Sequence, residues 1–212
     1  MVITYPLKSG LYVNLTNRCP CACVFCLRQN SPGVFGTESL WLEREPTVEE
    51  IVASIKSHNL DDFTEIVFCG YGEPTERLDD LLAVAKCVKG LKPNILVRIN
   101  TNGLSDLIHG EPTAAKLEGL VDTVSISLNT PDPEEYLKIC RPKFGLGSWQ
   151  ALLDFAKSCR EYGPDVVMTI VGSPVTTLEV QEKCKAITDE LGVRLRIRPY
   201  ETVGDSAPPP GR

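Results

Sequence analysis

The chain contains 212 residues and carries a formal net charge of −6, with 42% hydrophobic and 24% charged residues. A chain of this length and composition can bury one sizeable core, so we expect a single soluble globular domain. Proteins held mainly by nucleic-acid phosphates rely on clustered lysine and arginine, and the acidic balance of this chain argues against a nucleic-acid partner.

The sequence lacks obvious membrane and export signals. No run of about 18 apolar residues is present, so no membrane span is expected. Residues 1–11 lack the basic start and long apolar core of a secretory signal, and we therefore expect a cytoplasmic protein. The nine cysteines are many for this length and odd in number. In that compartment metal binding or redox use is expected rather than a set of disulfides.

Short apolar strands alternate with helical segments along the chain. Thr47 with Glu50, and Thr176 with Glu179, have the spacing of capping boxes and predict two helix starts. Residues 201–212 are proline-rich and predict an extended tail after a core domain of residues 1–200. The predicted strands are 11–17, 65–69, 95–99, 123–128, 166–171 and 193–198, and the predicted helices are 47–58, 77–89, 113–118, 133–139, 148–161 and 176–191.

This order of elements predicts a parallel α/β sheet with right-handed crossovers. Such a sheet is either open and doubly wound or curved into a partial barrel. In both arrangements functional residues are expected where the strands end, because the carboxyl ends of parallel strands meet at one edge. The motifs that follow the predicted strands are therefore the candidates for a site.

The densest candidate is the cysteine segment at residues 19–26, which reads Cys-Pro-Cys-Ala-Cys-Val-Phe-Cys. Four thiolates on one short loop are soft ligands suited to iron. A zinc site and a fully ligated electron-transfer cluster are the alternatives. Structural zinc usually takes two separated ligand pairs. The other cysteines, at positions 69, 87, 140, 159 and 184, show no pair spacing.

The spacing Cys19-x3-Cys23-x2-Cys26 resembles the motif of the radical S-adenosylmethionine (radical SAM) superfamily. The resemblance implies that these three cysteines hold a [4Fe–4S] cluster and leave one iron open. The amino and carboxylate groups of SAM bind that iron in the family. Phe25 matches the position beside the SAM adenine, and Cys21, inside the x3 gap, is expected to point away from the cluster.

Two further motifs follow the second and third predicted strands. Gly70-Tyr71-Gly72-Glu73-Pro74 resembles the family's Gly-Gly-Glu-Pro motif. The resemblance implies that Glu73 accepts from the SAM ammonium, that Gly72 permits close backbone approach and that Tyr71 points out of the pocket. Asn102, within Asn100-Thr101-Asn102-Gly103, is similar to the Thr-Asn-Gly element near SAM. An ordinary turn is the alternative for both motifs.

The last three strands carry weaker candidates. Alternation puts Ser125, Ser127 and Asn129 on one face, where Ser127 and Asn129 are candidates for binding ribose or carboxylate. Gly172 follows the fifth strand, where the family often passes adenine along the backbone. Arg196 lies among arginines spaced at period two and is a candidate for an anionic substrate or the SAM carboxylate. The alternatives are that the serines and the asparagine are ordinary polar residues without a ligand, and that the arginines form a solvent-exposed face.

The resemblance covers nearly the whole chain and implies a partial (βα)6 radical SAM barrel, with parallel strands and outer helices. The start and the Arg-Pro-Tyr end look like the TatD-associated radical SAM proteins, which implies a functional link to a TatD-type hydrolase. In outline the chain is similar to pyruvate formate-lyase activating enzymes and 7-carboxy-7-deazaguanine synthases.

The resemblance implies an enzyme that reductively cleaves SAM to form a 5′-deoxyadenosyl radical, with flavodoxin or ferredoxin as electron donor. The radical would abstract hydrogen from a small molecule that the sequence does not identify. An activase that installs a glycyl radical on a partner protein is the alternative enzyme. An iron–sulfur electron carrier or redox sensor is the alternative without SAM chemistry.

Overall fold

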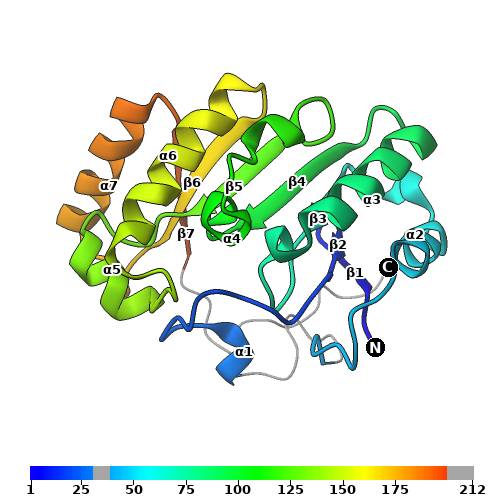
Figure 1. Ribbon diagram of the computed structural model, residues 1–212, viewed down its shortest axis with the longest axis horizontal. Helices are drawn as coiled ribbons and strands as arrows, with labels where there is room; N and C mark the ends of the chain where they lie inside the picture. The colour runs from blue at the N-terminus through cyan, green and yellow to red at the C-terminus, as the bar shows by residue number, and fades with distance from the viewer. Residues whose placement is uncertain (31–38, 200–212) are drawn as a thin grey trace.

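A seven-stranded sheet organises the fold in the computed structural model, which describes residues 1–30 and 39–199 (Figure 1). The predicted tail at 201–212 lies outside the described residues. The strands are β1 (Thr4–Leu7), β2 (Gly10–Val13), β3 (Glu65–Phe68), β4 (Leu96–Thr101), β5 (Thr123–Ser127), β6 (Asp165–Val171) and β7 (Arg194–Arg198).

Helices fill the connections between the strands. The α-helices are α1 (Leu27–Asn30), α2 (Val48–Lys56), α3 (Leu78–Leu91), α4 (Ser105–His109), α5 (Pro133–Cys140), α6 (Ser148–Glu161) and α7 (Leu178–Leu191). Short 3-10 helices are η1 (Leu60–Asp62), η2 (Pro74–Arg77), η3 (Ala114–Leu117) and η4 (Gly145–Gly147).

The strands lie side by side in chain order, from β1 to β7. The strands β2 to β7 pair in parallel, and β1 pairs antiparallel with β2 at the edge. The six parallel strands are the six that the sequence predicts. Parallel neighbours in chain order need a crossover each time, and the helices α2, α3, α5–α6 and α7 supply most of these connections.

The two faces of the sheet differ in chemistry because strand residues alternate between them. One face contributes fully buried apolar side chains, among them Val13, Phe68, Ile99 and Ile126. This face packs against the buried stripes of the helices, and Figure 1 shows α3 and α6 crossing the same side of the sheet. The other face carries tyrosine, arginine, serine and threonine. The sheet therefore has an apolar outer face and a polar inner face.

Several predicted boundaries differ from the structure. The strand predicted at 11–17 ends at Val13, because the following Asn14 turns its side chain to the carbonyl groups of Val2 and Leu40. The segment 113–118 forms the 3-10 helix η3 rather than an α-helix. The pattern did not predict β1 or α4, which have four and five residues and lack a long periodic stretch.

One capping residue is also corrected. The Thr47–Glu50 capping box is present at the start of α2. At the start of α7 the N-cap is Thr177, whose hydroxyl accepts from the Val180 amide at 3.3 Å. The hydroxyl of Thr176 instead donates to the Val171 carbonyl, 2.5 Å away at the end of β6.

Among the described residues, no helix is long and apolar enough to cross a membrane.

Candidate functional site

After β2 the chain runs below the strands in the view of Figure 1, and the cysteine segment reaches the carboxyl end of α5. Backbone hydrogen bonds fix its position there: the Ala22 amide donates to the Cys140 carbonyl at 3.1 Å, and the Val24 amide donates to the Ile139 carbonyl at 2.9 Å. In return, the Lys143 amide donates to the Pro20 carbonyl at 2.9 Å. The end of α5 therefore serves as the platform for the cysteines.

The cysteine thiols divide into two kinds. Cys19, Cys23 and Cys26 are partly exposed, while Cys21 is 3% exposed and Cys140 is completely buried. Cys140 and Cys21 donate hydrogen bonds to the Cys23 sulfur and lower the pKa of Cys23 to about 4. A hydrogen bond from Cys21 likewise lowers the pKa of Cys19, whereas burial raises the pKa of Cys26. The lowered pKa therefore favours a thiolate at Cys23, and the pKa of Cys19 is shifted in the same direction.

Cys21 does not point away from the other thiols, contrary to the expectation. Its backbone forms a β-bridge with Pro142, and its side chain packs into the main hydrophobic core. From that position its thiol donates to the sulfurs of Cys19 and Cys23. These hydrogen bonds raise the pKa of Cys21, so the neutral thiol is favoured at this position.

The donor set of the cysteine segment consists of thiols, the ligand type that holds an iron–sulfur cluster. Three partly exposed cysteines on one loop match a cubane, whose thiolate ligands bind different irons and are spread apart. Within residues 1–30 and 39–199, no three His, Cys, Asp or Glu side chains converge closely enough to hold one metal ion.

Glu73 lies at the centre of the loops that follow β3 and β4, and it is only 3% exposed. Its Oε1 accepts from the Thr75 amide at 3.1 Å, the Thr75 hydroxyl at 2.8 Å and the Thr101 hydroxyl at 2.7 Å. Burial raises the pKa of Glu73, and these hydrogen bonds oppose the shift by favouring the carboxylate. Oε2 accepts from the Asn102 amide at 2.7 Å, and a carboxylate oxygen has capacity for another donor.

Asn102 connects Glu73 to the cysteine segment. Its backbone amide binds Glu73, and its side-chain Nδ2 lies 4.0 Å from the Cys19 sulfur and 3.8 Å from the Cys21 sulfur. Its Oδ1 accepts from the Leu104 amide at 2.9 Å. The motifs after β2, β3 and β4 are therefore in direct contact. Sequence reasoning named Glu73 and Asn102 but not the bond between them.

Gly72 is required by protein packing. A Cβ added at Gly72 would collide with the Thr16 carbonyl oxygen and lie 2.6 Å from the Arg18 carbonyl oxygen. The Glu73 amide donates to that same Arg18 carbonyl at 2.7 Å. The close approach predicted for Gly72 is therefore an approach of two loops of the protein to each other.

Replacing Gly72 with alanine should force these two loops apart. We expect the free energy of unfolding to fall by about 1–3 kcal/mol, the usual cost of overpacking. Gly90→Ala is the matched control, because a Cβ at Gly90 meets nothing within 4 Å and alanine in helix α3 should stabilise by about 0.5–1 kcal/mol. Urea unfolding of both variants measures the difference. Equal stability of Gly72→Ala and the unmodified chain would contradict the packing argument.

The remaining predicted site residues each have their own contacts. Ser127 ends β5, whereas Asn129 leaves the strand alternation with a φ of 64° and its Nδ2 donates to the Cys140 sulfur at 3.3 Å. The Gly172 amide donates to the Arg198 carbonyl at 2.8 Å and continues the β6–β7 pairing. Phe25 is exposed.

Tyr71 packs with Tyr5 and Leu40 in a second small cluster. Its ring makes an edge contact with Trp41, at 5.4 Å between ring centroids. The expectation that Tyr71 turns away from the cofactor site agrees with this packing.

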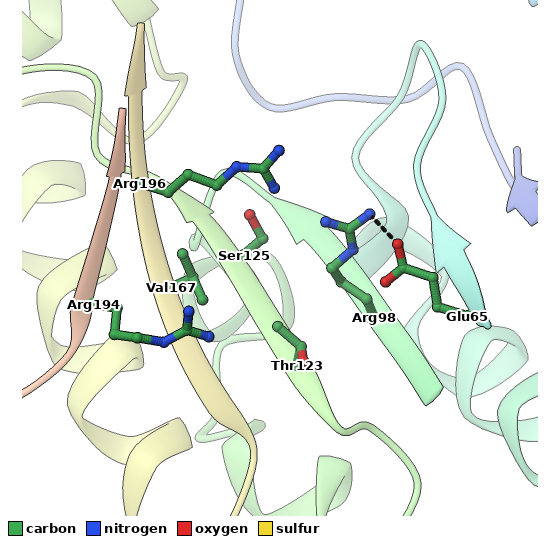
Figure 2. A pocket seen from close by; sticks show the side chains of 7 residues that line it. All are labelled: Glu65, Arg98, Thr123, Ser125, Val167, Arg194 and Arg196. Atoms are coloured by element: carbon green, nitrogen blue, oxygen red, sulfur yellow. Dashed lines mark hydrogen bonds and ion pairs between the residues drawn. The ribbon is translucent and has the colours of Figure 1, made fainter. Parts of the chain in front are cut away.

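Sequence reasoning missed a cavity on the polar inner face of the sheet. Figure 2 shows its lining, to which Arg196 contributes from β7. The cavity has a volume of about 190 Å³ and is lined by Glu65, Arg98, Thr123, Ser125, Val167, Arg194 and Arg196. A signal was available: Arg98 is a charged residue between apolar neighbours in the middle of a buried strand, and such residues are seldom buried without a partner.

Comparison with known proteins agrees with this arrangement. Residues 13–186 match the family model described as the Radical SAM superfamily. The chain is 31% identical over 137 residues to a probable GTP 3′,8-cyclase of Methanosarcina mazei, covering 62% of this chain and 36% of that protein. It is 32% identical over 137 residues to a GTP 3′,8-cyclase of Limosilactobacillus fermentum, covering 64% and 38%. The chain thus spans little more than a third of these relatives.

Solved structures show the same fold. A radical SAM methyltransferase from Sphaerobacter thermophilus aligns with a TM-score of 0.61 and 17% identity, over 94% of this chain and 68% of that one. Native anSMEcpe with bound AdoMet aligns with a TM-score of 0.61 and 17% identity, over 91% and 53%. The predicted partial barrel is confirmed. The chain belongs to the radical SAM superfamily of enzymes, whose cofactors are a [4Fe–4S] cluster and S-adenosylmethionine.

Proposed function

We propose that this protein reductively cleaves SAM at a [4Fe–4S] cluster and uses the product radical on a small-molecule substrate. When bound, the cluster and SAM supply an electron to the sulfonium and a 5′-deoxyadenosyl radical that abstracts hydrogen. The observation that carries the proposal is the contact chain from the cysteine segment through Asn102 to the buried carboxylate of Glu73.

The cluster ligands in this proposal are Cys19, Cys23 and Cys26. The hydrogen bonds that Cys21 and Cys140 donate favour thiolates at positions 19 and 23, and thiolates are the form that binds iron. Cys21 and Cys140 take the role of donors to ligand sulfurs. Hydrogen bonds to cluster sulfurs are one of the means by which a protein tunes a cluster's potential.

Glu73 binds the SAM ammonium in this proposal. Its Oε2 accepts from the amide of Asn102, whose side chain lies beside the Cys19 and Cys21 sulfurs, so an ammonium beside the cluster would add a charge-assisted hydrogen bond. Asn102 positions that carboxylate. An electron carrier with a fully ligated cluster would have no use for a buried, hydrogen-bonded carboxylate beside the cysteines, and the arrangement favours the SAM enzyme.

A small molecule is favoured over a glycyl-radical loop of a partner protein. The observation is the cavity on the inner face of the sheet, with the largely buried Arg98 in its wall. The similar proteins named GTP 3′,8-cyclase act, by their names, on a small phosphorylated molecule. Flavodoxin or ferredoxin as electron donor, and a link to a TatD-type hydrolase, remain proposals from the resemblance.

Formation of 5′-deoxyadenosine tests the proposal directly. The protein is reconstituted with iron and sulfide without oxygen, then given dithionite and SAM, and the products are analysed by mass spectrometry. We expect 5′-deoxyadenosine and methionine in equal amounts. About four irons per chain without 5′-deoxyadenosine would overturn the proposal in favour of an electron carrier. About one zinc and no iron would overturn the cluster itself.

A further inference from the structure

The inner face of the sheet carries a concentrated set of hydrogen-bonding side chains. Register places Arg98 of β4 opposite Thr123 of β5, and Asn100 opposite Ser125. Ser127 follows in the next position of the same face, opposite Thr169 of β6. Parallel strands enclosed by helices normally read as continuous apolar runs. The polar residues here therefore line a space rather than a core, and the cavity lies in that space.

Arg98 is the charged residue most enclosed in this cavity. Its side chain is 14% exposed, and its Nη2 donates to Glu65 at 2.9 Å and to the Tyr12 hydroxyl at 3.3 Å. Its Nε is buried and has no hydrogen-bond partner among the described residues. The Oδ1 of Asn100, on the same face of β4, is also buried without a partner there. Buried polar atoms are normally paired, so the unpartnered Nε of Arg98, a residue that lines the cavity, points to a ligand.

Arg196 faces Arg98 across the cavity. Figure 2 shows its guanidinium reaching over β6 toward β5, with the Ser125 side chain below it in the view and the Arg98 guanidinium to the right. Among the residues the structure describes, Arg194 pairs with Asp165 and Arg98 pairs with Glu65, while Arg196 has no carboxylate partner. The cavity therefore carries an excess of positive charge although the whole chain is acidic.

We propose that this cavity binds the carboxylate or phosphate group of the substrate between Arg98 and Arg196. Ser125, which also lines the cavity, donates a further hydrogen bond. Arginine suits this role because its planar fork matches both oxyanions. At about 190 Å³ the cavity is smaller than the roughly 300–1,000 Å³ of typical ligand pockets. It therefore holds a small anion or the anionic end of a larger molecule.

This inference rests on the proposed function, since it names the substrate class of the same enzyme. The competing explanation is that Arg98 and Glu65 form a purely structural ion pair. The two explanations differ in the role of Glu65. If Arg98 binds an anion, Glu65 competes with that anion for the guanidinium. If the pair is structural, removing Glu65 has no effect on anion binding.

The test measures anion binding by the cluster-loaded protein through its thermal midpoint. Inorganic phosphate and succinate are the two probes, each compared with chloride at equal ionic strength, because ligands of the folded state raise the midpoint. We expect one or both probes to raise it. Arg196→Gln and Arg98→Gln should abolish the rise. Arg44→Gln, which removes a surface arginine paired with Glu50, should keep it.

The direction in which Glu65→Gln changes the affinity for the probe decides between the two explanations. We expect it to strengthen probe binding by about threefold or more, because it removes a negative charge beside the anion. No rise in the unmodified chain with either probe, an unchanged rise in Arg196→Gln, or an unchanged or weaker affinity in Glu65→Gln would each overturn the inference. Arg196 and Glu65 keep the test valid if Arg98→Gln fails to fold.

The response to the two probes distinguishes a phosphate from a carboxylate group. Formation of 5′-deoxyadenosine by the same unmodified preparation separates the two proposals. Anion binding without 5′-deoxyadenosine would sink the proposed function alone, and 5′-deoxyadenosine without anion binding would sink this inference alone.

Discussion

Replacing Cys23 with alanine should remove the iron–sulfur cluster, whereas replacing Cys21 with alanine should leave it in place. Both cysteines lie on the same loop, and Cys21 is the more buried of the two. Cys23 receives hydrogen bonds from Cys140 and Cys21, which lower its pKa to about 4. The thiol of Cys21 donates to the sulfurs of Cys19 and Cys23, and these bonds raise its own pKa. The ligand must be a thiolate, so we expect the loss at position 23.

The expected difference in iron content between the two variants is large. After anaerobic reconstitution, Cys21→Ala should bind about four irons per chain, and Cys23→Ala should bind below about one. Iron and sulfide analysis, together with the visible absorption of the cluster, measures this. Cys140→Ala is a second control, because Cys140 also donates to Cys23 from a buried position. It should keep the iron while changing the potential of the cluster.

Cys21→Ala also removes a side chain from the hydrophobic core. Circular dichroism is therefore used to confirm that each variant is folded before iron is counted. Loss of iron from folded Cys21→Ala would show that Cys21 is a ligand. Full iron content in folded Cys23→Ala would contradict the assignment of Cys23.

Glu73→Gln should weaken SAM binding by about tenfold or more, equivalent to about 1.4 kcal/mol, while the cluster remains. Glutamine removes the negative charge that would pair with the SAM ammonium. Its Oε1 can still accept from Thr75 and Thr101. Its amide nitrogen would face the Asn102 amide, which donates to Oε2 of Glu73 in the structure. Two donors would then meet, at a cost in stability of about 1–3 kcal/mol.

Titration of SAM into the reduced cluster, followed by electron paramagnetic resonance, measures the affinity. Iron content and urea unfolding are measured on the same preparations. Glu111→Gln is the matched control, since Glu111 is an exposed carboxylate paired with Lys116, and it should change none of these quantities. SAM affinity equal to that of the unmodified chain would show that Glu73 only holds the loops together.

The sequence predicts these outcomes only in part. The cysteine spacing and the glutamate motif identify Cys23 and Glu73 because each motif is contiguous, and a contiguous motif is visible without a fold. The sequence does not predict which of Cys21 and Cys23 is the ligand and which is the hydrogen-bond donor. Their roles depend on contacts with Pro142 and Cys140, which lie more than a hundred residues later in the chain. No local sequence pattern joins residues so far apart.

The sequence motif correctly identified Gly72 as a position of close approach, but the structure gives a different reason for the glycine. The motif singled it out for close approach at the cofactor site, and the structure shows that its neighbours are the backbone carbonyls of Thr16 and Arg18. Arg98 shows the opposite case. It lies in no motif, and its importance comes from its burial beside Glu65 and from its Nε, which has no hydrogen-bond partner among the described residues.

The sequence by itself determined the order of six strands and their crossover helices, the cysteine segment and the residues at the mouth of the sheet. These follow from periodicity, capping patterns and short motifs, which are local properties of the chain. Only the tertiary structure decided that Asn102 connects Glu73 to the cysteines, that Cys21 faces the ligand thiols and that Arg98 and Arg196 share a cavity. These are contacts between distant segments, and they exist only once the sheet has curved and brought its inner face together.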